Sequence, residues 1–376
     1  MVPRPNHHES PLGNWMNEAE LQALCISPDH SIWQAIACIN HGGQGITIVV
    51  DEEGHLLGTV TDGDVRRAML ASVDLETPVS ALLARKAESS SSYPRPVTAP
   101  LGTPRDALLQ LMQKRLVRQI PLLDADGRVK DLALLNDLIA PPAVALQAVI
   151  MAGGFGTRLR PLTEELPKPM LPVGDRPLME RIVAQLRDAG IRQVNVTTHH
   201  QRERIIGHFG DGQAFGVQMN YVNEDRPLGT AGSLGLMPAP DAPLLVINGD
   251  ILTQVDFRAM IAFHQEHKAD MTVGVRQYGL QVPYGVIECE GPYVSRLTEK
   301  PQHRFFVNAG IYLLEPSVHR HIRSDRHFDM TELIQCLLDA RQCVVSFPIH
   351  EYWLDIGQHP DYVQAQEDVQ NGRIAP

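Results

Sequence analysis

The first 140 residues contain one pattern of apolar and polar positions twice. In each copy an apolar run, a turn rich in Asp and Gly, a second apolar run and a helical stretch follow one another, over residues 45–70 and 118–139. The turns are DEEG at 51–54 and DADG at 124–127, so both copies predict strand, tight turn, strand and helix. Such an internal repeat predicts that one unit packs on the other.

A helical stretch also precedes each copy, at residues 31–40 and 103–115. In the second stretch, Thr103 followed by Pro104 is a typical helix start. Between the two copies, the segment ARKAESSSSYPRP at 84–96 is rich in Ser and Pro, which is typical of a linker.

These patterns divide the N-terminal part of the chain. Residues 1–20 are polar and are expected to form an arm, and the two repeats are expected over about 21–83 and 96–140. A second boundary falls at APPA, residues 140–143.

After that boundary, apolar strands alternate with helical periodicity. A helix that ends at a glycine, Gly190, is predicted over 177–190. Apolar strands are predicted at 146–154, 193–198, 242–250 and 271–275. Strands that alternate with helices predict an open, mostly parallel α/β sheet over residues 145–376. Ligands of such sheets lie at the carboxyl ends of the strands.

The strongest motif follows the first of these strands and reads MAGGFGTRLRPLTEELPKPMLPVG. Its glycines, which allow a sharp turn that presents backbone N–H groups to an anion, are Gly153, Gly154 and Gly156. Arg158 offers a planar fork of donors for phosphate oxygens, and Lys168 stands between two prolines that stiffen its segment. No Gly-Lys-Ser/Thr follows, and Leu159 stands where a dinucleotide fingerprint needs its third Gly. The motif therefore predicts a phosphate-binding loop of another kind.

Composition narrows the function classes. The formal net charge of -11 and the pI near 5.8 argue against nonspecific nucleic-acid binding. No apolar run reaches the roughly 18 residues that span a bilayer, and the N-terminal segment has no apolar signal-peptide core. The five cysteines are scattered without a CxxC pair, as reduced cytosolic thiols are. We expect a cytoplasmic protein with no nucleic-acid or membrane partner.

The string GGFGTRLRPLTEELPKPM resembles the signature of the sugar-1-phosphate nucleotidylyltransferase family, which includes GDP-mannose pyrophosphorylase-like and glucosamine-1-phosphate guanylyltransferase-like enzymes. Further segments that resemble the family follow in its order over about 230 residues. They are DRPLGTAGSL (225–234), NGD (248–250), PYGVIE (283–288), EKP (299–301), NAGIY (308–312) and WLDIG (353–357). The resemblance implies a Rossmann-like nucleotidyltransferase domain over 145–376. It also implies transfer of a nucleotidyl group to a sugar-1-phosphate, with release of pyrophosphate.

The resemblance implies roles for the charged residues of these segments. Asp250 and Asp355 would bind Mg²⁺, the expected cofactor, because carboxylates are ligands that hard cations prefer. Arg158 would hold the leaving β- and γ-phosphates, and Lys168 would stabilise charge on the α-phosphate. The implied catalytic set is therefore Arg158, Lys168 and Asp250.

A second implied set would bind the sugar-1-phosphate. Lys300 would hold its phosphate, and Glu299 would accept hydrogen bonds from sugar hydroxyls. The backbone of Gly285 and of Asn308 would line the sugar pocket.

The nucleoside triphosphate would bind to the glycine loop, including Thr157, and to the loop that carries Gly229 and Thr230. Glu224, just before that second loop, can accept hydrogen bonds from the N1–H and N2–H₂ edge of guanine. Thymidylyl members of the family usually carry Gln and a different loop here. GTP is therefore the favoured nucleotide, with UTP as the alternative.

The N-terminal repeat resembles a tandem pair of CBS domains (a Bateman module), an α+β module that commonly binds adenosine ligands. The segment GTVTDGDVRRAML carries the resemblance, with Thr61 and Asp64 at positions that contact phosphate and ribose hydroxyls. In the second repeat Asp137 matches Asp64, but Leu134 replaces Thr61. AMP or ATP is the expected ligand and regulator, and a module used only for packing or dimerisation is the alternative.

Other readings stay open at this point. A fusion of this kind resembles enzymes that make activated sugars for surface glycans, and the sugar itself is not identified. A catalytically silent nucleotide sensor is the alternative from another class, and the complete set of Arg158, Lys168, Asp250, Lys300 and Asp355 argues against it. Cytidylyl transfer to an alditol phosphate or choline phosphate is a third reading, against which the sugar-site segments count. CBS pairs and this transferase family both tend to associate, so a homo-oligomer is expected.

Overall fold

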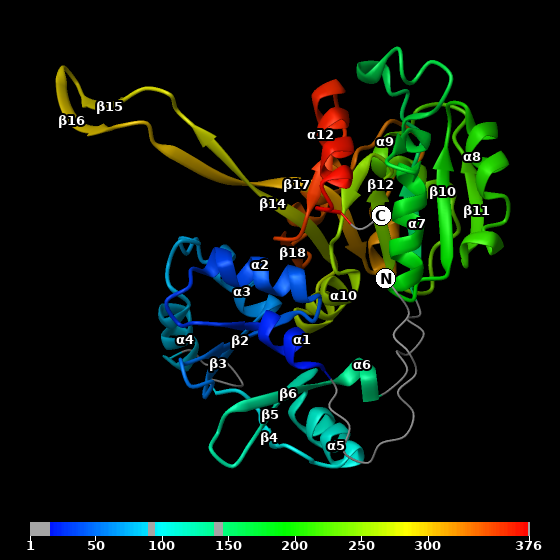
Figure 1. Ribbon diagram of the computed structural model, residues 1–376. Helices are drawn as coiled ribbons and strands as arrows, with labels where there is room; N and C mark the ends of the chain where they lie inside the picture. The colour runs from blue at the N-terminus through cyan, green and yellow to red at the C-terminus, as the bar shows by residue number, and fades with distance from the viewer. Residues whose placement is uncertain (1–15, 89–94, 139–145, 375–376) are drawn as a thin grey trace. The chain divides into compact units, whose positions relative to one another are not determined.

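The computed structural model of the chain describes residues 16–88, 95–138 and 146–374 (Figure 1). The chain divides into two compact units, Met1–Pro142 and Ala143–Pro376, called the N-terminal and C-terminal units below. Within the described residues, no helix is long and apolar enough to cross a membrane.

The first repeat of the N-terminal unit is a three-stranded sheet of order β1-β2-β3 with helices packed on it. β1 runs parallel to β2, and β2 runs antiparallel to β3. Its elements are α1 (Glu18–Ala23), β1 (Cys25–Ile26), α2 (Ile32–Gly42), β2 (Ile46–Val50), β3 (Leu56–Thr61), α3 (Asp62–Leu70) and α4 (Val79–Glu88).

The second repeat has the same sheet, with order β4-β5-β6 and the same strand directions. Its elements are β4 (Ala99–Pro100), α5 (Arg105–Arg115), β5 (Gln119–Leu123), β6 (Val129–Leu134) and α6 (Leu135–Leu138). The predicted internal repeat of strand, turn, strand and helix is therefore confirmed.

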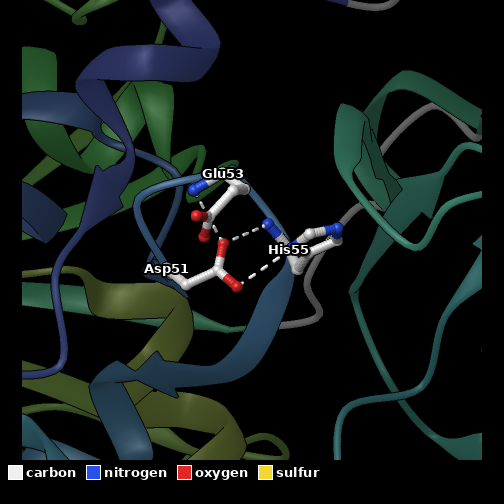
Figure 2. A group of neighbouring side chains, drawn as sticks. All are labelled: Asp51, Glu53 and His55. Atoms are coloured by element: carbon white, nitrogen blue, oxygen red, sulfur yellow. Dashed lines mark hydrogen bonds and ion pairs between the residues drawn. The ribbon is translucent and has the colours of Figure 1, made fainter.

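One aspartate closes the equivalent turn in each repeat. The Asp51 carboxylate accepts hydrogen bonds from the backbone N–H groups of Glu53 (3.0 Å) and His55 (2.8 Å), and it lies 2.9 Å from His55 Nδ1 (Figure 2). Asp124 accepts in the same way from the N–H groups of Asp126 (3.0 Å) and Arg128 (2.9 Å). The turn alone therefore explains the position of each aspartate.

The two repeats join through these turns. The Leu56 N–H donates to the Gly127 carbonyl (3.3 Å), and the equivalent Val129 N–H donates to the Gly54 carbonyl (3.0 Å). This reciprocal pairing relates the two repeats by an approximate two-fold axis. A shared core lies beside it, made of Met16, Leu21, Leu24, Ile46, Ile48, Leu132 and Leu134. One repeat thus packs on the other, as the sequence predicts.

The C-terminal unit is built on a seven-stranded sheet of order β11-β10-β7-β12-β17-β14-β18. All neighbouring strands run parallel except for β17, which is antiparallel to both β12 and β14. The strands are β7 (Gln147–Met151), β10 (Gln193–Thr198), β11 (Gln218–Asn223), β12 (Leu244–Asn248), β14 (Met271–Gln281), β17 (Gln302–Leu314) and β18 (Val344–Ile349). The expected open, mostly parallel α/β sheet is confirmed.

Helices cover both faces of this sheet. On one face, apolar side chains of α7 (Leu178–Asp188), α8 (Arg202–Phe209) and α10 (Phe257–Glu266) join the core. On the other face, α9 (Gly229–Gly232) and α11 (Met330–Asp339) contribute. The central strands are buried on both sides, which explains why β7 and β12 are apolar nearly throughout.

The central hairpin of the sheet extends beyond it. β14 and β17 continue outward, and β15 (Val286–Glu290) and β16 (Tyr293–Thr298) form the far end of the extension (Figure 1). No residue from Arg276 to Asn308 is buried. We call residues 276–308 the arm. The sequence predicted only the inner end of β14, over 271–275, because polar residues interrupt the apolar run after Val275.

Three sequence predictions need correction. The helix predicted over 103–115 begins at Arg105, because Pro104 is its N-cap and the Thr103 hydroxyl donates to the Pro100 carbonyl (2.7 Å) instead. The predicted linker, 84–96, begins inside α4, which continues to Glu88 because Val79 and Leu82 anchor it in the core. The predicted arm over 1–20 ends earlier, since Asn17 caps α1 at Glu18. Residues 1–15 and 89–94 lie outside the described residues.

The shared core of the two repeats yields a stability prediction. Leu132→Ala should lower the free energy of opening of β2 and β6 by about 2–5 kcal/mol, because Leu132 is fully buried between the repeats. Leu57→Ala, on β3 but half exposed, should change it by less than about 0.5 kcal/mol. Hydrogen exchange of the full chain, followed by mass spectrometry of β2 and β6 peptides, measures both. Equal effects of the two variants would contradict a shared core.

Candidate active site

Two aspartates are brought together by a short pair of strands at the carboxyl end of β12. Asp250 follows β12 and precedes β13 (Ile251–Thr253), which pairs antiparallel with β19 (Trp353–Asp355). In this ladder Ile251 lies opposite Asp355, and the Ile356 N–H donates to the Asp250 carbonyl (3.0 Å). Backbone pairing therefore fixes the two carboxylates beside each other, although about a hundred residues separate them in the sequence.

Lys168 completes this group. It begins a short 3-10 turn, η2 (Lys168–Met170), and its side chain is buried. Its Nζ lies 2.5 Å from Asp250 Oδ2 and 4.0 Å from Asp355 Oδ1. The Asp355 side chain is half exposed, and its pKa is raised first by partial desolvation and then by the nearby Asp250 carboxylate, while Lys168 and Arg158 offset only part of that rise. The two carboxylates thus repel each other, and the lysine supplies the closest compensating charge.

Apolar neighbours anchor each of these charged residues. Leu159, Leu171, Leu252 and Ile356 are buried in one cluster, and they lie within a few positions of Arg158, Lys168, Asp250 and Asp355 respectively. The cluster continues into α12 (His359–Gln370) through Ala365. The charged side chains are therefore positioned by a common apolar base.

The donor set fits a divalent cation. Carboxylate oxygens are the ligands that hard cations prefer, and a cation between Asp250 and Asp355 would relieve the repulsion between the two carboxylates. Asp51, Glu53 and His55 are a second set of candidate ligands, and within the described ranges they are the one group of three whose ligand atoms lie within 4.8 Å of one another. Their hydrogen bonds close a turn that Asp124 closes equally well without a histidine, so they do not indicate a metal.

The glycine loop folds against Lys168. Gly156 has φ +62°, and a Cβ there would come within 2.9 Å of Thr163 and 3.3 Å of Lys168. The Thr163 hydroxyl donates to the Gly156 carbonyl (2.8 Å), which holds the loop closed. Only glycine fits at this position.

The rest of the loop is open to solvent. Gly154, Thr157 and Arg158 are exposed, and a Cβ at Gly154 would meet nothing within 4 Å. Arg158 lies in η1 (Thr157–Leu159), and its guanidinium comes near Gly357, two residues after Asp355. The loop therefore leaves backbone N–H groups and one guanidinium beside the carboxylate pair.

Glu224 reaches the other side of the loop from the end of β11. It is buried, its Oε2 accepts from the Leu228 N–H (3.1 Å), and a Cβ at Gly153 would lie 2.7 Å from its Oε1. Burial raises the pKa of Glu224, and the Leu228 N–H opposes that rise. His199 Nδ1 lies 2.7 Å from the Glu224 carbonyl and helps to fix this position. The sequence predicts only a surface position for His199, because the adjacent pair His199-His200 lacks the spacing of metal ligands on a helix face.

The second loop, with Gly229 and Thr230, is held by the segment before α11. Gly229 has φ +80°, and a Cβ there would lie 2.6 Å from Asp329 Oδ1 and 2.7 Å from the Phe328 carbonyl. The Thr230 N–H donates to the Asp329 carboxylate (3.1 Å), and the Thr230 hydroxyl accepts from the Met330 N–H (2.9 Å). Sequence reasoning missed Asp329, whose one visible signal is its capping box with Glu332.

The residues expected to bind the sugar lie in two different parts of the arm. Asn308 lies at the inner end of the arm, where its side chain accepts from the Gly310 N–H (2.9 Å), and Gly310 packs against Asn248 at the end of β12. Gly285, Glu299 and Lys300 lie farther out on the arm, with Glu299 against Gly285. Among the described residues, no hydrogen bond or ion pair joins these three to the carboxylate pair.

The expected adenosine-site residues of the first repeat are already satisfied by the protein. The Asp64 carboxylate is buried and accepts from the Thr61 N–H (3.0 Å), the Thr61 hydroxyl (2.9 Å) and Lys86 Nζ (2.8 Å). Arg67 donates to its other oxygen (2.8 Å). Burial of Asp64 opposes its ionisation, but Lys86 and these donors outweigh burial and lower its pKa.

The second repeat lacks the Thr61 hydroxyl, and the cavity of the first repeat lies away from Thr61 and Asp64. Leu134 is buried where the first repeat has Thr61, and the Asp137 carbonyl accepts a hydrogen bond from Arg105. A cavity of about 390 Å³ lies between residues 25–30 and 50–52, at the opposite end of the β2–β3 ladder from Thr61. Thr61 and Asp64 do not line that cavity.

The Asp64 ion pair yields a pH-dependent prediction. The folded-state pKa of Asp64 is lowered, so the pair stabilises the N-terminal unit above the unfolded-state value of about 3.9 and is lost as the pH falls through the folded-state pKa. Lys86→Met should therefore destabilise this unit by about 1.5–3 kcal/mol at neutral pH, because Asp64 loses a charged partner. The difference from wild type should shrink on acidification.

Hydrogen exchange of α3 amides in the full chain, at neutral and acidic pH, measures this loss. Lys114→Met is the matched control, because Lys114 is exposed on α5. A loss that is the same at both pH values would contradict the assigned role of Lys86.

The chain is similar in sequence to curated sugar-1-phosphate nucleotidyltransferases. A mannose-1-phosphate guanylyltransferase of Mycobacterium tuberculosis is 32% identical over 240 residues, which cover 61% of this chain and 66% of that protein. A UTP–glucose-1-phosphate uridylyltransferase of Synechocystis is 33% identical over 250 residues, covering 61% and 64%. The chain thus spans less than two thirds of the length of these curated relatives.

A solved structure shares the fold of the C-terminal unit. It is described as a glucose-1-phosphate thymidylyltransferase from Bacillus anthracis in complex with a sucrose, and it matches with a TM-score of 0.50 at 26% identity. The match covers 59% of this chain and 94% of that one. The CBS domain model matches residues 15–71, and the nucleotidyl transferase model matches residues 147–372. Since the latter match spans more than half of the chain, the protein belongs to the nucleotidyl transferase family and carries a CBS domain at its N-terminus.

Proposed function

We propose that the chain is a sugar-1-phosphate nucleotidylyltransferase that uses GTP. A phosphate oxygen of the sugar-1-phosphate forms a bond to the α-phosphorus, the bond from the α-phosphorus to the bridging oxygen breaks, and pyrophosphate leaves. The observation that carries this proposal is the group of Lys168, Asp250 and Asp355 beside an open glycine loop. Such a transfer needs charge neutralisation and positioning more than covalent chemistry.

Each charged residue has one role in this proposal. Asp250 and Asp355 would hold a divalent cation, proposed to be Mg²⁺, which when bound neutralises phosphate charge. Arg158 would bind the leaving β- and γ-phosphates, and Lys168 would stabilise charge on the α-phosphate. The N–H groups of the glycine loop would bind phosphate oxygens in the same way.

The proposed base is guanine. Glu224 is a buried carboxylate between the two nucleotide loops, and when ionised it can accept from the N1–H and N2–H₂ groups of guanine. The similarity to a mannose-1-phosphate guanylyltransferase supports guanine, and mannose-1-phosphate is the first sugar to test. The similarity to a UTP–glucose-1-phosphate uridylyltransferase makes UTP with glucose-1-phosphate the second candidate.

The proposed product, cellular location and regulation are based on the resemblances found in the sequence. The product would be an activated sugar for surface glycans, made in the cytoplasm. An adenosine nucleotide at Thr61 and Asp64 would act on the transferase by linkage, that is, by binding differently to its active and less active states. Because Lys86 and Arg67 already occupy the Asp64 carboxylate, such a ligand would have to displace at least one of them. A homo-oligomer also stays a prediction.

The reaction can be tested directly by measuring pyrophosphate release. Four triphosphates (GTP, UTP, CTP and dTTP) are crossed with mannose-, glucose-, glucosamine- and N-acetylglucosamine-1-phosphate, with Mg²⁺ and with or without AMP. Release is expected with GTP and one sugar-1-phosphate, and it should stop when EDTA is added. No pyrophosphate release with any pair would contradict the proposed transfer and favour a nucleotide sensor.

The same assay tests the carboxylate pair. Asp250→Asn should lower turnover by about a hundredfold or more, because one negative ligand is lost where charge must be balanced. Asp241→Asn, an exposed aspartate just before β12, is the matched control and should keep wild-type turnover. Wild-type-like turnover of folded Asp250→Asn would overturn the role of Asp250.

A further inference from the structure

The segment that carries Arg158 and Lys168 lies outside the strands of the central sheet. We call residues 158–174 the basic segment. Between η1 and η2 it forms turns, in which the Glu164 N–H, for example, donates to a carbonyl three residues back (3.0 Å). Turns of this kind do not join the segment to the rest of the unit. Besides its apolar anchors, the segment therefore depends on side chains from elsewhere, such as Gln201, whose Nε2 donates to the Glu164 carbonyl (2.8 Å).

α12 binds the start of the basic segment through its first residue. His359 Nε2 lies 2.7 Å from the Arg160 carbonyl. Because a carbonyl can only accept, Nε2 carries the proton and donates it to this hydrogen bond. Arg160 is two residues after Arg158, whose Nη1 would lie 3.9 Å from a Cβ at Gly357. The start of the segment is thus held against the chain that follows Asp355.

Two further side chains of α12 bind the end of the basic segment. The Tyr362 hydroxyl donates to the Pro172 carbonyl (2.7 Å). The Gln366 amide donates to the same carbonyl (2.7 Å) and accepts from the Gly174 N–H (2.9 Å). Gln366 therefore uses both a donor and an acceptor on the backbone that follows Lys168.

These three side chains form one face of α12, because they follow the i, i+3 and i+7 spacing of a helix. We call them the polar face of α12. The helix is itself fixed by other contacts. Ala365 is buried in the apolar cluster under the charged site residues. The buried Asp368 carboxylate accepts from the Tyr352 hydroxyl (2.7 Å), just before the strand that carries Asp355.

We propose that the polar face of α12 positions the two cations of the basic segment for the transfer, with His359 and Gln366 as the positioning residues. This inference rests on the proposed function, since it assigns both cations to the phosphates of the nucleotide. The helix begins four residues after Asp355 and binds the segment near both of its ends, so one element joins the metal carboxylate to both cations.

The expected effect is on the rate of transfer more than on folding. Each of these hydrogen bonds lies at the surface, where the loss of one bond changes stability little. In contrast, a displacement of about 1 Å in a group that must face the transition state can lower a rate about a hundredfold.

Pyrophosphate release by full-length variants tests the contact at the start of the segment. His359→Ala should lower kcat about tenfold and leave the KM for the sugar-1-phosphate within about twofold, as expected when an interaction acts in the transition state. His359→Gln should restore most of kcat, because its amide can donate to the same carbonyl. Equal losses in both variants would overturn the assigned hydrogen bond.

A graded series tests the contact at the end of the segment. Gln366→Ala removes a donor and an acceptor and should lower kcat about tenfold, whereas Tyr362→Phe leaves Gln366 on the Pro172 carbonyl and should lower kcat less. Gln370→Ala, at an exposed position on the same helix, is the matched control and should keep wild-type kcat. Unchanged kcat in both Gln366→Ala and His359→Ala would overturn the proposal.

Hydrogen exchange without substrates separates this proposal from the proposed function. In His359→Ala and Gln366→Ala, peptides that cover residues 157–171 should exchange faster than in wild type, while peptides of β10 and β12 stay unchanged. Unchanged exchange over 157–171 would overturn the proposal even if no substrate pair gives turnover. Faster exchange with wild-type kcat would also overturn it, because α12 would then hold the segment without positioning the cations for transfer.

Discussion

The contact between the Lys168 ammonium and the Asp250 carboxylate, with Asp355 on the other side, is the interaction on which the candidate site depends. Two carboxylates held side by side by a backbone ladder repel each other, and this repulsion adds to partial desolvation in raising the pKa of Asp355. The arrangement persists because Leu159, Leu171, Leu252 and Ile356 anchor the neighbouring backbone in one apolar cluster. The site thus combines opposed charges on an apolar base, and under the proposed function it would bind highly charged phosphates.

The N-terminal unit also contains a carboxylate that is paired with a lysine. Asp64 is buried and remains charged because Lys86, Arg67 and Thr61 surround it. Lys86 lies on α4, which ends at Glu88, just before the segment that joins the two repeats. Its ion pair with Asp64 therefore connects the expected nucleotide site to this helix. A ligand that binds the Asp64 carboxylate would compete with Lys86, so the proposed regulation would begin with a displacement of this contact from α4.

Much of the fold was predictable because its signals are local. The signals are the apolar runs of β7, β10 and β12, the Asp/Gly turns of the two repeats and the glycine loop, and each of them is contained in a short stretch of consecutive residues. The carboxylate pair was predictable only through resemblance, since nothing local joins Asp250 to Asp355. Asp329 and His199 were missed because their contacts, with Thr230 and with the Glu224 carbonyl, are made across the fold.

The arm was not predictable from the sequence. Periodicity after Val275 is too weak to predict that β14 continues to Gln281, and composition does not show that Glu299 and Lys300 lie away from the sheet. Whether a strand stays within the sheet or extends beyond it depends on tertiary contacts, and the local sequence does not show these contacts.

The most direct test of the account is a titration of Mn²⁺ into the nucleotide-free full chain, followed by electron paramagnetic resonance. Wild type should bind Mn²⁺ saturably, and Asp355→Asn should weaken that binding about tenfold or more, because it removes one of two carboxylate ligands. Asp51→Asn, which removes a member of the other candidate ligand set, should leave the affinity unchanged. Unchanged affinity in Asp355→Asn, or loss in Asp51→Asn alone, would contradict the assignment of the metal to Asp250 and Asp355.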